Sequence, residues 1–212
     1  MSFEQSIQAF DGQPLTRQVL LGILSDYQRP YDKLHELVRQ QLLVQVKRGL
    51  FVAGPKLSIR PPEPFLLANH LMGPSYISVE TALSYWRLIP EQVFEISSMI
   101  TRRNHSYETP VGRFTYTRLP LPYFSYGQQS IELSKGQVAL IASPEKALCD
   151  KIVTTHQLRF RGVVPLKQWL LEDMRIEREA LRGFKIPIIE SWLATAPKRQ
   201  SLALLVKTLE DL

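Results

Sequence analysis

The feature that most constrains this sequence is a change of hydrophobic repeat near residue 42. From residue 30 to residue 41, apolar side chains recur at steps of three and four, the repeat of a helix with one buried face. Val44 and Val46 then alternate with their neighbours, which predicts a strand, and residues 50–53 predict a returning strand. Lys47-Arg48-Gly49 joins the two, with a glycine that can take a positive φ angle. The segment therefore predicts a helix followed by a β-hairpin with a basic turn.

Two shorter helical patterns precede this segment. Phe3, Ile7 and Phe10 share one helix face, and Gly12-Gln13-Pro14 ends the pattern. A second pattern runs over residues 15–24, and Pro30 suits the first turn of the third helix. Three short helices closed by a hairpin are typical of a winged helix-turn-helix, which we predict over residues 1–54.

The predicted third helix and hairpin have the chemistry of a DNA-binding surface. A helix fits the major groove, and Lys47 and Arg48 in the hairpin turn suit phosphates or the minor groove. Asp32 and Glu36 on the same helix would repel phosphate, and winged helices also bind proteins, so a protein-interaction module is the alternative. The candidate DNA contacts on the third helix are Arg29, Tyr31, Lys33, His35, Arg39 and Gln40.

Four prolines between residues 55 and 64 predict a stiff linker, followed by a second domain over residues 65–212. In that domain Ser78 and Ser143 are predicted to cap helices, the latter with Pro144 in the first turn. The predicted fold class is α+β: a winged helix-turn-helix followed by a mixed α/β domain with a small sheet and several helices. Strands are predicted near residues 93–97, 107–109, 114–118 and 138–141, and later helices near 166–174, 176–181, 188–193 and 201–209.

Composition narrows the classes of protein and partner. The net charge of +6 favours an anionic partner, with nucleic acid the first candidate. Cys149 is the only cysteine, so a disulfide within the chain is excluded and a reducing compartment is expected. Neither a secretory signal pattern nor an apolar run of roughly 20 residues occurs, so we expect a soluble cytoplasmic protein without a membrane partner.

Motifs for catalysis are missing from the sequence. Glycine-rich phosphate loops and a GxSxG elbow do not occur, and the four histidines lack the spacing of metal ligands. We therefore expect no enzyme, no metal and no cofactor. Arg102, Arg103, Arg113 and Arg118 near a predicted aromatic hairpin suggest binding of RNA or an acidic partner. We favour the alternative that its aromatic side chains pack inward.

Four segments together resemble a known family. They are residues 47–52, residues 73–83, residues 109–114 and residues 142–148, which include the runs KRGLFV, GPSYIS, TPVGRF and ASPEKAL in that order. With these segments in register, the chain resembles AbiEi-type antitoxins, the transcriptional regulators of abortive-infection toxin–antitoxin pairs, over roughly residues 15–160.

The resemblance implies a role for each predicted domain. The winged helix would bind repeats in its own promoter as double-stranded DNA and repress the operon. The C-terminal domain would counteract a cognate nucleotidyltransferase toxin, without a stable complex. By position, Lys47 and Arg48 match the basic wing, while the third helix is less basic than a strong DNA reader. The residues assigned to the antitoxin or partner region are Tyr76, Ser78, Arg102, Arg103, Arg113, Glu145 and Lys146.

Overall fold

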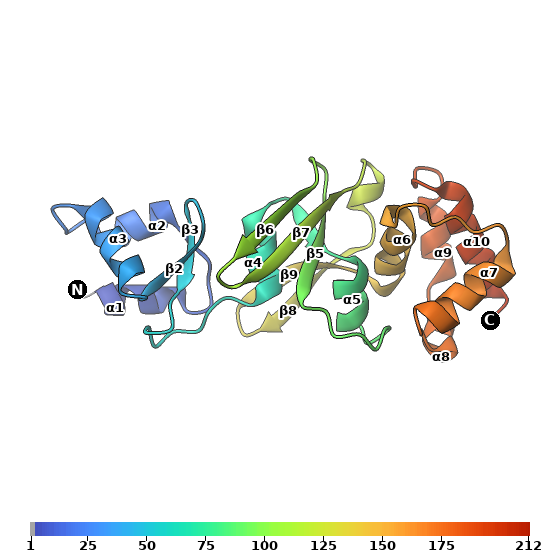
Figure 1. Ribbon diagram of the computed structural model, residues 1–212, viewed down its shortest axis with the longest axis horizontal. Coiled ribbons are helices and arrows are strands. Elements are labelled where there is room, and N and C mark those ends of the chain that lie inside the picture. The colour runs from blue at the N-terminus through green and yellow to red at the C-terminus, as the bar shows by residue number, and fades with distance from the viewer. Residues whose placement is uncertain (1–2) are drawn as a thin grey trace.

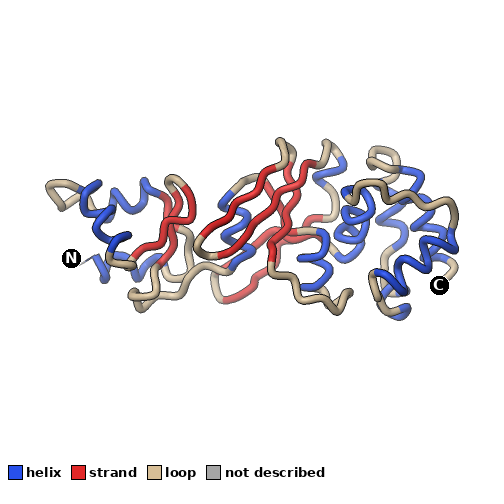
Figure 2. The backbone as a smooth tube through the Cα atoms, in the orientation of Figure 1, coloured by secondary structure: helices blue, strands red, loops and turns tan. Residues whose placement is uncertain are grey.

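The computed structural model describes residues 3–212, which form three parts in a row along the long axis of the molecule (Figure 1). Helices with a three-stranded sheet lie at one end, a six-stranded mixed sheet lies in the middle, and a group of helices lies at the other end (Figure 2). The predicted α+β class is confirmed. The two ends of the chain lie at opposite ends of the molecule.

The N-terminal module has the predicted order of three helices and a hairpin. The Thr16 side chain caps α2 by accepting a hydrogen bond from the Val19 amide at 3.3 Å, and Gly49 turns the hairpin at a φ angle of +85°. Residues 15–16, predicted as helix, instead pair with β3. The elements are α1 (Phe3–Ile7), η1 (Gln8–Phe10), β1 (Leu15–Thr16), α2 (Arg17–Ile23), α3 (Pro30–Arg39), β2 (Leu43–Lys47) and β3 (Leu50–Ala53), with sheet order β1-β3-β2.

The hairpin of β2 and β3, the wing, is buried on both faces. Leu43 and Phe51 pack in a core made only of N-terminal residues and the start of the linker. Val46, Leu50 and Val52 belong to the larger core of the second domain. The wing therefore joins the two domains through apolar contacts on either side of one small sheet.

The predicted linker is packed against both domains. Leu57 lies in the N-terminal core, and the Arg60 guanidinium pairs with the Asp11 carboxylate at 2.8 Å. The Gln137 side chain accepts a hydrogen bond from the Glu63 amide. The segment lacks helix and strand up to Glu63, but Pro64, predicted as linker, is the first residue of α4. This proline-rich segment is therefore an ordered connection that packs against both domains.

The second domain is built on the six-stranded sheet, in the order β6-β7-β5-β4-β9-β8. β4 runs parallel to β9 and antiparallel to β5, and β5 runs parallel to β7, so the sheet is mixed. Its elements are α4 (Pro64–Leu71), β4 (Ser75–Ile77), α5 (Val79–Tyr85), β5 (Glu95–Ile100), β6 (His105–Thr109), β7 (Gly112–Arg118), η2 (Tyr123–Ser125), β8 (Gln128–Ser134), β9 (Gln137–Ala142) and α6 (Pro144–Thr154).

Helices make up the C-terminal part. The helix predicted near residues 166–174 consists of an α-helical segment followed by a π-helix, and the other three predicted helices are present with slightly shifted ends. Within residues 3–212, every helix is too short or too polar to cross a membrane. The elements are α7 (Val163–Gln168), η3 (Trp169–Asp173), α8 (Arg178–Arg182), α9 (Ile186–Trp192) and α10 (Arg199–Glu210).

Elements missing from the sequence-based prediction include α4, β4 and β8. α4 follows the proline cluster directly, and β4 is only three residues long. β8 has the sequence QQSIELS, in which most side chains are polar, so it gives little hydrophobic alternation. Its place at the sheet edge beside β9 allows this composition, because one strand edge needs no partner.

Gly54 provides a test of the junction between wing and linker. A Cβ atom at Gly54 would overlap the backbone carbonyl of Gln41, whereas a Cβ atom at Gly22 on the exposed side of α2 would meet nothing within 4 Å. We expect Gly54→Ala to lower the free energy of unfolding by about 2 kcal/mol or more, because backbone must move. We expect Gly22→Ala to raise it by about 0.5–1 kcal/mol. Urea unfolding of both variants measures this, and equal effects would contradict the packing at Gly54.

Candidate nucleic-acid interface

The exposed face of α3 carries a single stripe of residues suited to base edges and phosphates. Tyr31, His35 and Arg39 recur every four residues and are all exposed, with Tyr31 at 56%. Leu34 and Leu37 point into the N-terminal core and fix the rotation of the helix. The stripe is therefore held on a rigid element, with its side chains free to reach into a groove.

The acidic residues of α3 are paired with neighbours on the same helix. The Arg29 guanidinium lies 3.9 Å from Asp32. Glu36 accepts hydrogen bonds from the Lys33 ammonium at 3.0 Å and from the Gln40 side chain at 2.7 Å. The Lys33 bond lowers the pKa of the Glu36 carboxyl, which stays ionised and locally neutralised. Lys33 and Gln40, predicted as DNA contacts, thus donate their hydrogen bonds to Glu36 on the helix surface.

The two predicted wing residues lie in different environments. The Lys47 ammonium donates a hydrogen bond to the Leu71 carbonyl oxygen at the end of α4 and lies 5.6 Å from the centre of the Tyr107 ring. Burial lowers the pKa of Lys47. Arg48 is exposed, and within residues 3–212 it has no ion pair. Lys47 is therefore a contact between domains in this structure, a role that its sequence position did not predict, and Arg48 is the free cation of the wing turn.

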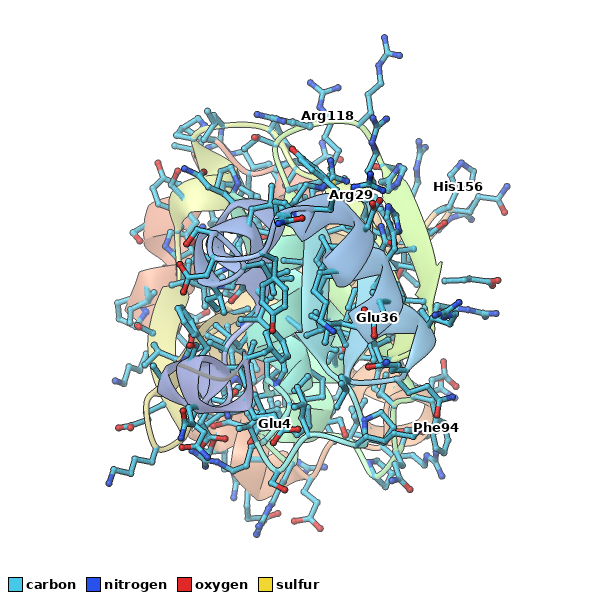
Figure 3. The ribbon with its side chains drawn as sticks, turned by 90° about the vertical axis from the view of Figure 1, so that its left-hand side faces the viewer. Glu4, Arg29, Glu36, Phe94, Arg118 and His156 are labelled. Carbon is cyan, nitrogen blue, oxygen red and sulfur yellow. The ribbon has the colours of Figure 1, made fainter. Side chains whose placement is uncertain are left out.

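The loop between β5 and β6 continues this basic side of the molecule. The wing contacts β6 at Tyr107, whose ring packs on His105 at 4.4 Å, so the start of β6 lies beside the wing. Arg102 and Arg103 are exposed in the loop that precedes β6. The wing turn and this loop point to the same side in Figure 1, and Arg29 and Arg118 both lie on the upper side in Figure 3.

The aromatic residues of the β6–β7 hairpin pack inward, as the favoured alternative predicted. Phe114 and Tyr116 are buried, and the Tyr116 hydroxyl donates to the Ala68 carbonyl oxygen at 2.7 Å. Arg113 pairs with Glu108 at 2.7 Å on the outer face. Phe114 and Tyr116 are therefore not available for stacking on RNA bases.

Three residues assigned to the antitoxin region meet around a carboxylate that the sequence did not single out. Asp150 on α6 accepts hydrogen bonds from the Tyr76 hydroxyl at 2.8 Å and the Ser78 hydroxyl at 2.7 Å. The Lys146 ammonium lies 2.8 Å from the other Asp150 oxygen and 3.3 Å from the centre of the Tyr123 ring. The side chains of Lys146 and Asp150 are both fully buried.

Burial controls the charges in this network. Burial lowers the pKa of Lys146, while Asp150 opposes that change by stabilising the ammonium. Burial and the nearby Asp150 carboxylate raise the pKa of Tyr76 well above its usual range, so its hydroxyl remains a hydrogen-bond donor. The network is an ion pair enclosed in the fold, in which both Asp150 oxygens accept hydrogen bonds.

This burial corrects the assignment of Tyr76, Ser78 and Lys146 to a partner-binding region, because buried side chains offer no docking surface. Glu145 is also buried, and its carboxylate accepts a hydrogen bond from the Lys185 amide at 3.1 Å, which attaches α6 to the start of α9. The four-residue spacing of Lys146 and Asp150 on a predicted helix was the signal for their pairing. Of the assigned residues, Arg102, Arg103 and Arg113 are exposed.

Ser78 does not cap α5 with its side chain, since its hydroxyl is bound to Asp150. Ser143 caps α6 as predicted, accepting from the Lys146 amide at 3.2 Å. The Cys149 thiol is buried, and burial raises its pKa. Across residues 3–212, His, Cys, Asp and Glu do not gather in a group of three or more that would suit a metal ion.

The chain shares the fold of a mycobacterial protein. The crystal structure of the Rv2827c protein from Mycobacterium tuberculosis matches with a TM-score of 0.65 over 97% of this chain and 75% of that chain, at 14% identity. At this identity the match to Rv2827c concerns the fold alone. No family model and no curated protein matched the sequence.

The buried pair predicts a strongly non-additive response to mutation. Lys146→Met leaves the Asp150 carboxylate buried without its counter-ion, and we expect it to lower the free energy of unfolding by about 3–5 kcal/mol. Adding Asp150→Asn removes that charge while keeping an oxygen for Tyr76 and Ser78, so the double variant should recover much of the loss. Urea unfolding across the double-mutant cycle measures this coupling.

The matched control for this cycle is an exposed ion pair on another helix. Glu179 lies 4.0 Å from Arg182 on α8, and both side chains are more than half exposed. We expect Glu179→Ala to change stability by less than about 0.5 kcal/mol. A double variant as unstable as the sum of its single variants would contradict the buried pairing.

Proposed function

We propose that this chain is a DNA-binding transcriptional repressor that uses its winged helix to bind the promoter of its own operon. The observation that carries the proposal is the exposed Tyr31–His35–Arg39 stripe on α3, beside acidic residues that are already paired. Arg48 in the wing turn adds a cation suited to a phosphate on the same element that fixes α3 in place.

The basic surface extends beyond the winged helix. Arg102 and Arg103 in the β5–β6 loop follow the wing along the same side of the molecule. Phosphates spaced along a duplex that passes the wing would come close to this loop, which would add affinity without sequence selectivity. The second domain would then support DNA binding as well as its own activity.

We propose further that the second domain counteracts a nucleotidyltransferase toxin encoded beside this gene. This part rests on the four sequence segments that resemble AbiEi-type antitoxins, and the fold shared with Rv2827c extends over 97% of this chain, hence over both domains. Because Tyr76, Ser78 and Lys146 are buried, the recurring segments that contain them serve the stability of this domain. The activity would need neither a cofactor nor a catalytic residue of this chain.

DNA binding is tested with the full chain and a labelled duplex of the region upstream of its gene. We expect Arg39→Ala with Arg48→Ala to weaken binding roughly tenfold or more, and to reduce the slope of log K against log salt concentration by about 2. Fluorescence anisotropy across a salt series measures both quantities. Lys207→Ala, an exposed lysine on α10 at the far end of the molecule, controls for the loss of a positive charge away from this surface.

Unchanged affinity and slope in the double variant would exclude the α3–wing surface as the DNA site. The toxin proposal has a separate readout: growth of cells that express the neighbouring nucleotidyltransferase, with and without this chain. We expect rescue of growth without co-purification of the two proteins. Failure to rescue would exclude the antitoxin role and leave the DNA-binding role untouched.

The alternative is a winged-helix module that forms a stable complex with a partner protein. One observation favours it: Phe94 is 86% exposed beside a pocket of about 400 Å³ lined in part by Tyr85, Ile96 and Val111. Phe94 lies on the lower side of Figure 3, away from Arg29 and Arg118. This alternative predicts a stable complex that Phe94→Ser abolishes, together with no shift of upstream DNA.

A further inference from the structure

The C-terminal helices contain a pocket that the proposed function does not use. It lies at the N-terminal end of α10, between that end and the segment that follows α6, and has a volume of about 740 Å³. The DNA-binding and antitoxin roles proposed above do not involve this region. The residues that matter for its chemistry are Arg159, Phe160, Arg161, Lys198, Arg199 and Ser201.

All charged residues that line the pocket are positive. Arg159, Arg161 and Arg199 are exposed, and none of them has an ion-pair partner in the part of the chain that the structure describes. The residues that line the pocket include no Asp or Glu, and the first turn of α10 has none either. Three unpaired guanidinium groups around one pocket favour a ligand with negative charge.

Lys198 fixes the position of this cluster. Its ammonium donates to the carbonyl oxygens of Ile152 at 2.9 Å and Thr155 at 2.6 Å, which ties the start of α10 to the end of α6. Burial and, next, the positive charge of Arg159 lower the pKa of Lys198, so Arg159 lies near it. The Lys198 ammonium is therefore engaged by backbone carbonyl oxygens. The arginines are the cations that remain available to a ligand.

The N-terminus of α10 adds donors that the protein itself does not use. Lys198 precedes the helix without a side-chain cap; its carbonyl oxygen accepts from the Ser201 and Leu202 amides, so among residues 3–212 the Arg199 and Gln200 amides are the ones left without an acceptor. In a helix of 12 residues, the positive end of the dipole lies at the same place. These donors and the arginine cluster face one pocket.

Ser201 is the independent sign of a ligand. It lines the pocket and is only 8% exposed, yet its hydroxyl has no hydrogen-bond partner among residues 3–212. Such a hydroxyl sits on a mostly buried residue and opens to the pocket, so it is a donor that a ligand can use. A ligand oxygen in the pocket would accept this hydrogen bond.

We propose that this pocket binds the phosphate of a nucleotide. Arginines, the amides of a helix N-terminus and a serine hydroxyl are the donors that phosphate oxygens accept. The pocket volume is typical of a site for a small organic ligand rather than for a bare anion. Phe160, which packs on Trp169 with ring centres 5.3 Å apart, supplies an apolar wall for the base or sugar.

The test is isothermal titration of the full chain at low salt with adenosine 5′-monophosphate, orthophosphate and adenosine. We expect the nucleotide to bind with a Kd below about 1 mM, orthophosphate to bind more weakly and adenosine to give no heat. A 5′-phosphorylated RNA pentamer and its 5′-hydroxyl form identify the source of the phosphate. If the site takes a strand end, the phosphorylated pentamer binds and the hydroxyl form does not; if it takes a free nucleotide, only the monophosphate binds.

Variants then locate the site. Arg161→Ala with Arg199→Ala should weaken nucleotide binding about tenfold or more. Ser201→Ala should weaken it several-fold while leaving the thermal midpoint nearly unchanged, because the hydroxyl makes no hydrogen bond within residues 3–212 that the variant would lose. Lys207→Ala, on the same helix away from the pocket, should change the Kd less than twofold. Absence of binding by every phosphate probe at 1 mM, or equal losses in Lys207→Ala, would overturn the proposal.

Discussion

The wing hairpin, apolar on both faces, is the constraint on which the rest of the structure depends. Phe51 and Leu43 complete the small N-terminal core, while Val46, Leu50 and Val52 belong to the core of the second domain. A hairpin fixed in this way cannot swing freely as a DNA-contacting arm. Its turn can present Arg48, but Lys47 is held on the end of α4 and against Tyr107. The orientation of α3 relative to the six-stranded sheet is therefore set by hydrophobic burial.

Local pairing of charges decides which residues of α3 remain free. The helix carries both signs of charge, and its composition alone suggests a weak DNA-binding surface. In the structure, Asp32 and Glu36 are paired along the helix with Arg29, Lys33 and Gln40. The exposed side chains of α3 that remain unpaired form one stripe, which consists of a phenol ring, an imidazole and a guanidinium group. In the proposed DNA-binding role, such a surface would give sequence selectivity from few contacts and leave much of the affinity to basic residues elsewhere.

The second domain depends on a buried ion pair in which both carboxylate oxygens of Asp150 accept hydrogen bonds. Lys146 and Asp150 join α6 to β4 through Tyr76 and to the η2 turn through the Tyr123 carbonyl oxygen, which accepts from Lys146 at 3.0 Å. A buried ion pair of this kind favours one packing arrangement because a shifted α6 would leave a charge unpaired. The residue types around positions 76 and 146 are thus explained by folding, and the proposed binding functions would fall to exposed basic positions.

The sequence by itself determined the local elements. The change of repeat near residue 42, the capping Ser143 with Pro144, and the basic turn with Gly49 were sufficient to predict the winged helix, α6 and the α+β class, because these depend on neighbours in the chain. Only the tertiary structure decided what each polar side chain contacts. Lys47 reaches the end of α4, Tyr76 reaches Asp150 across 74 positions, and the C-terminal arginines meet at one end of α10. Such contacts follow from how strands and helices pack at long range, and spacing along one chain carries no record of that packing.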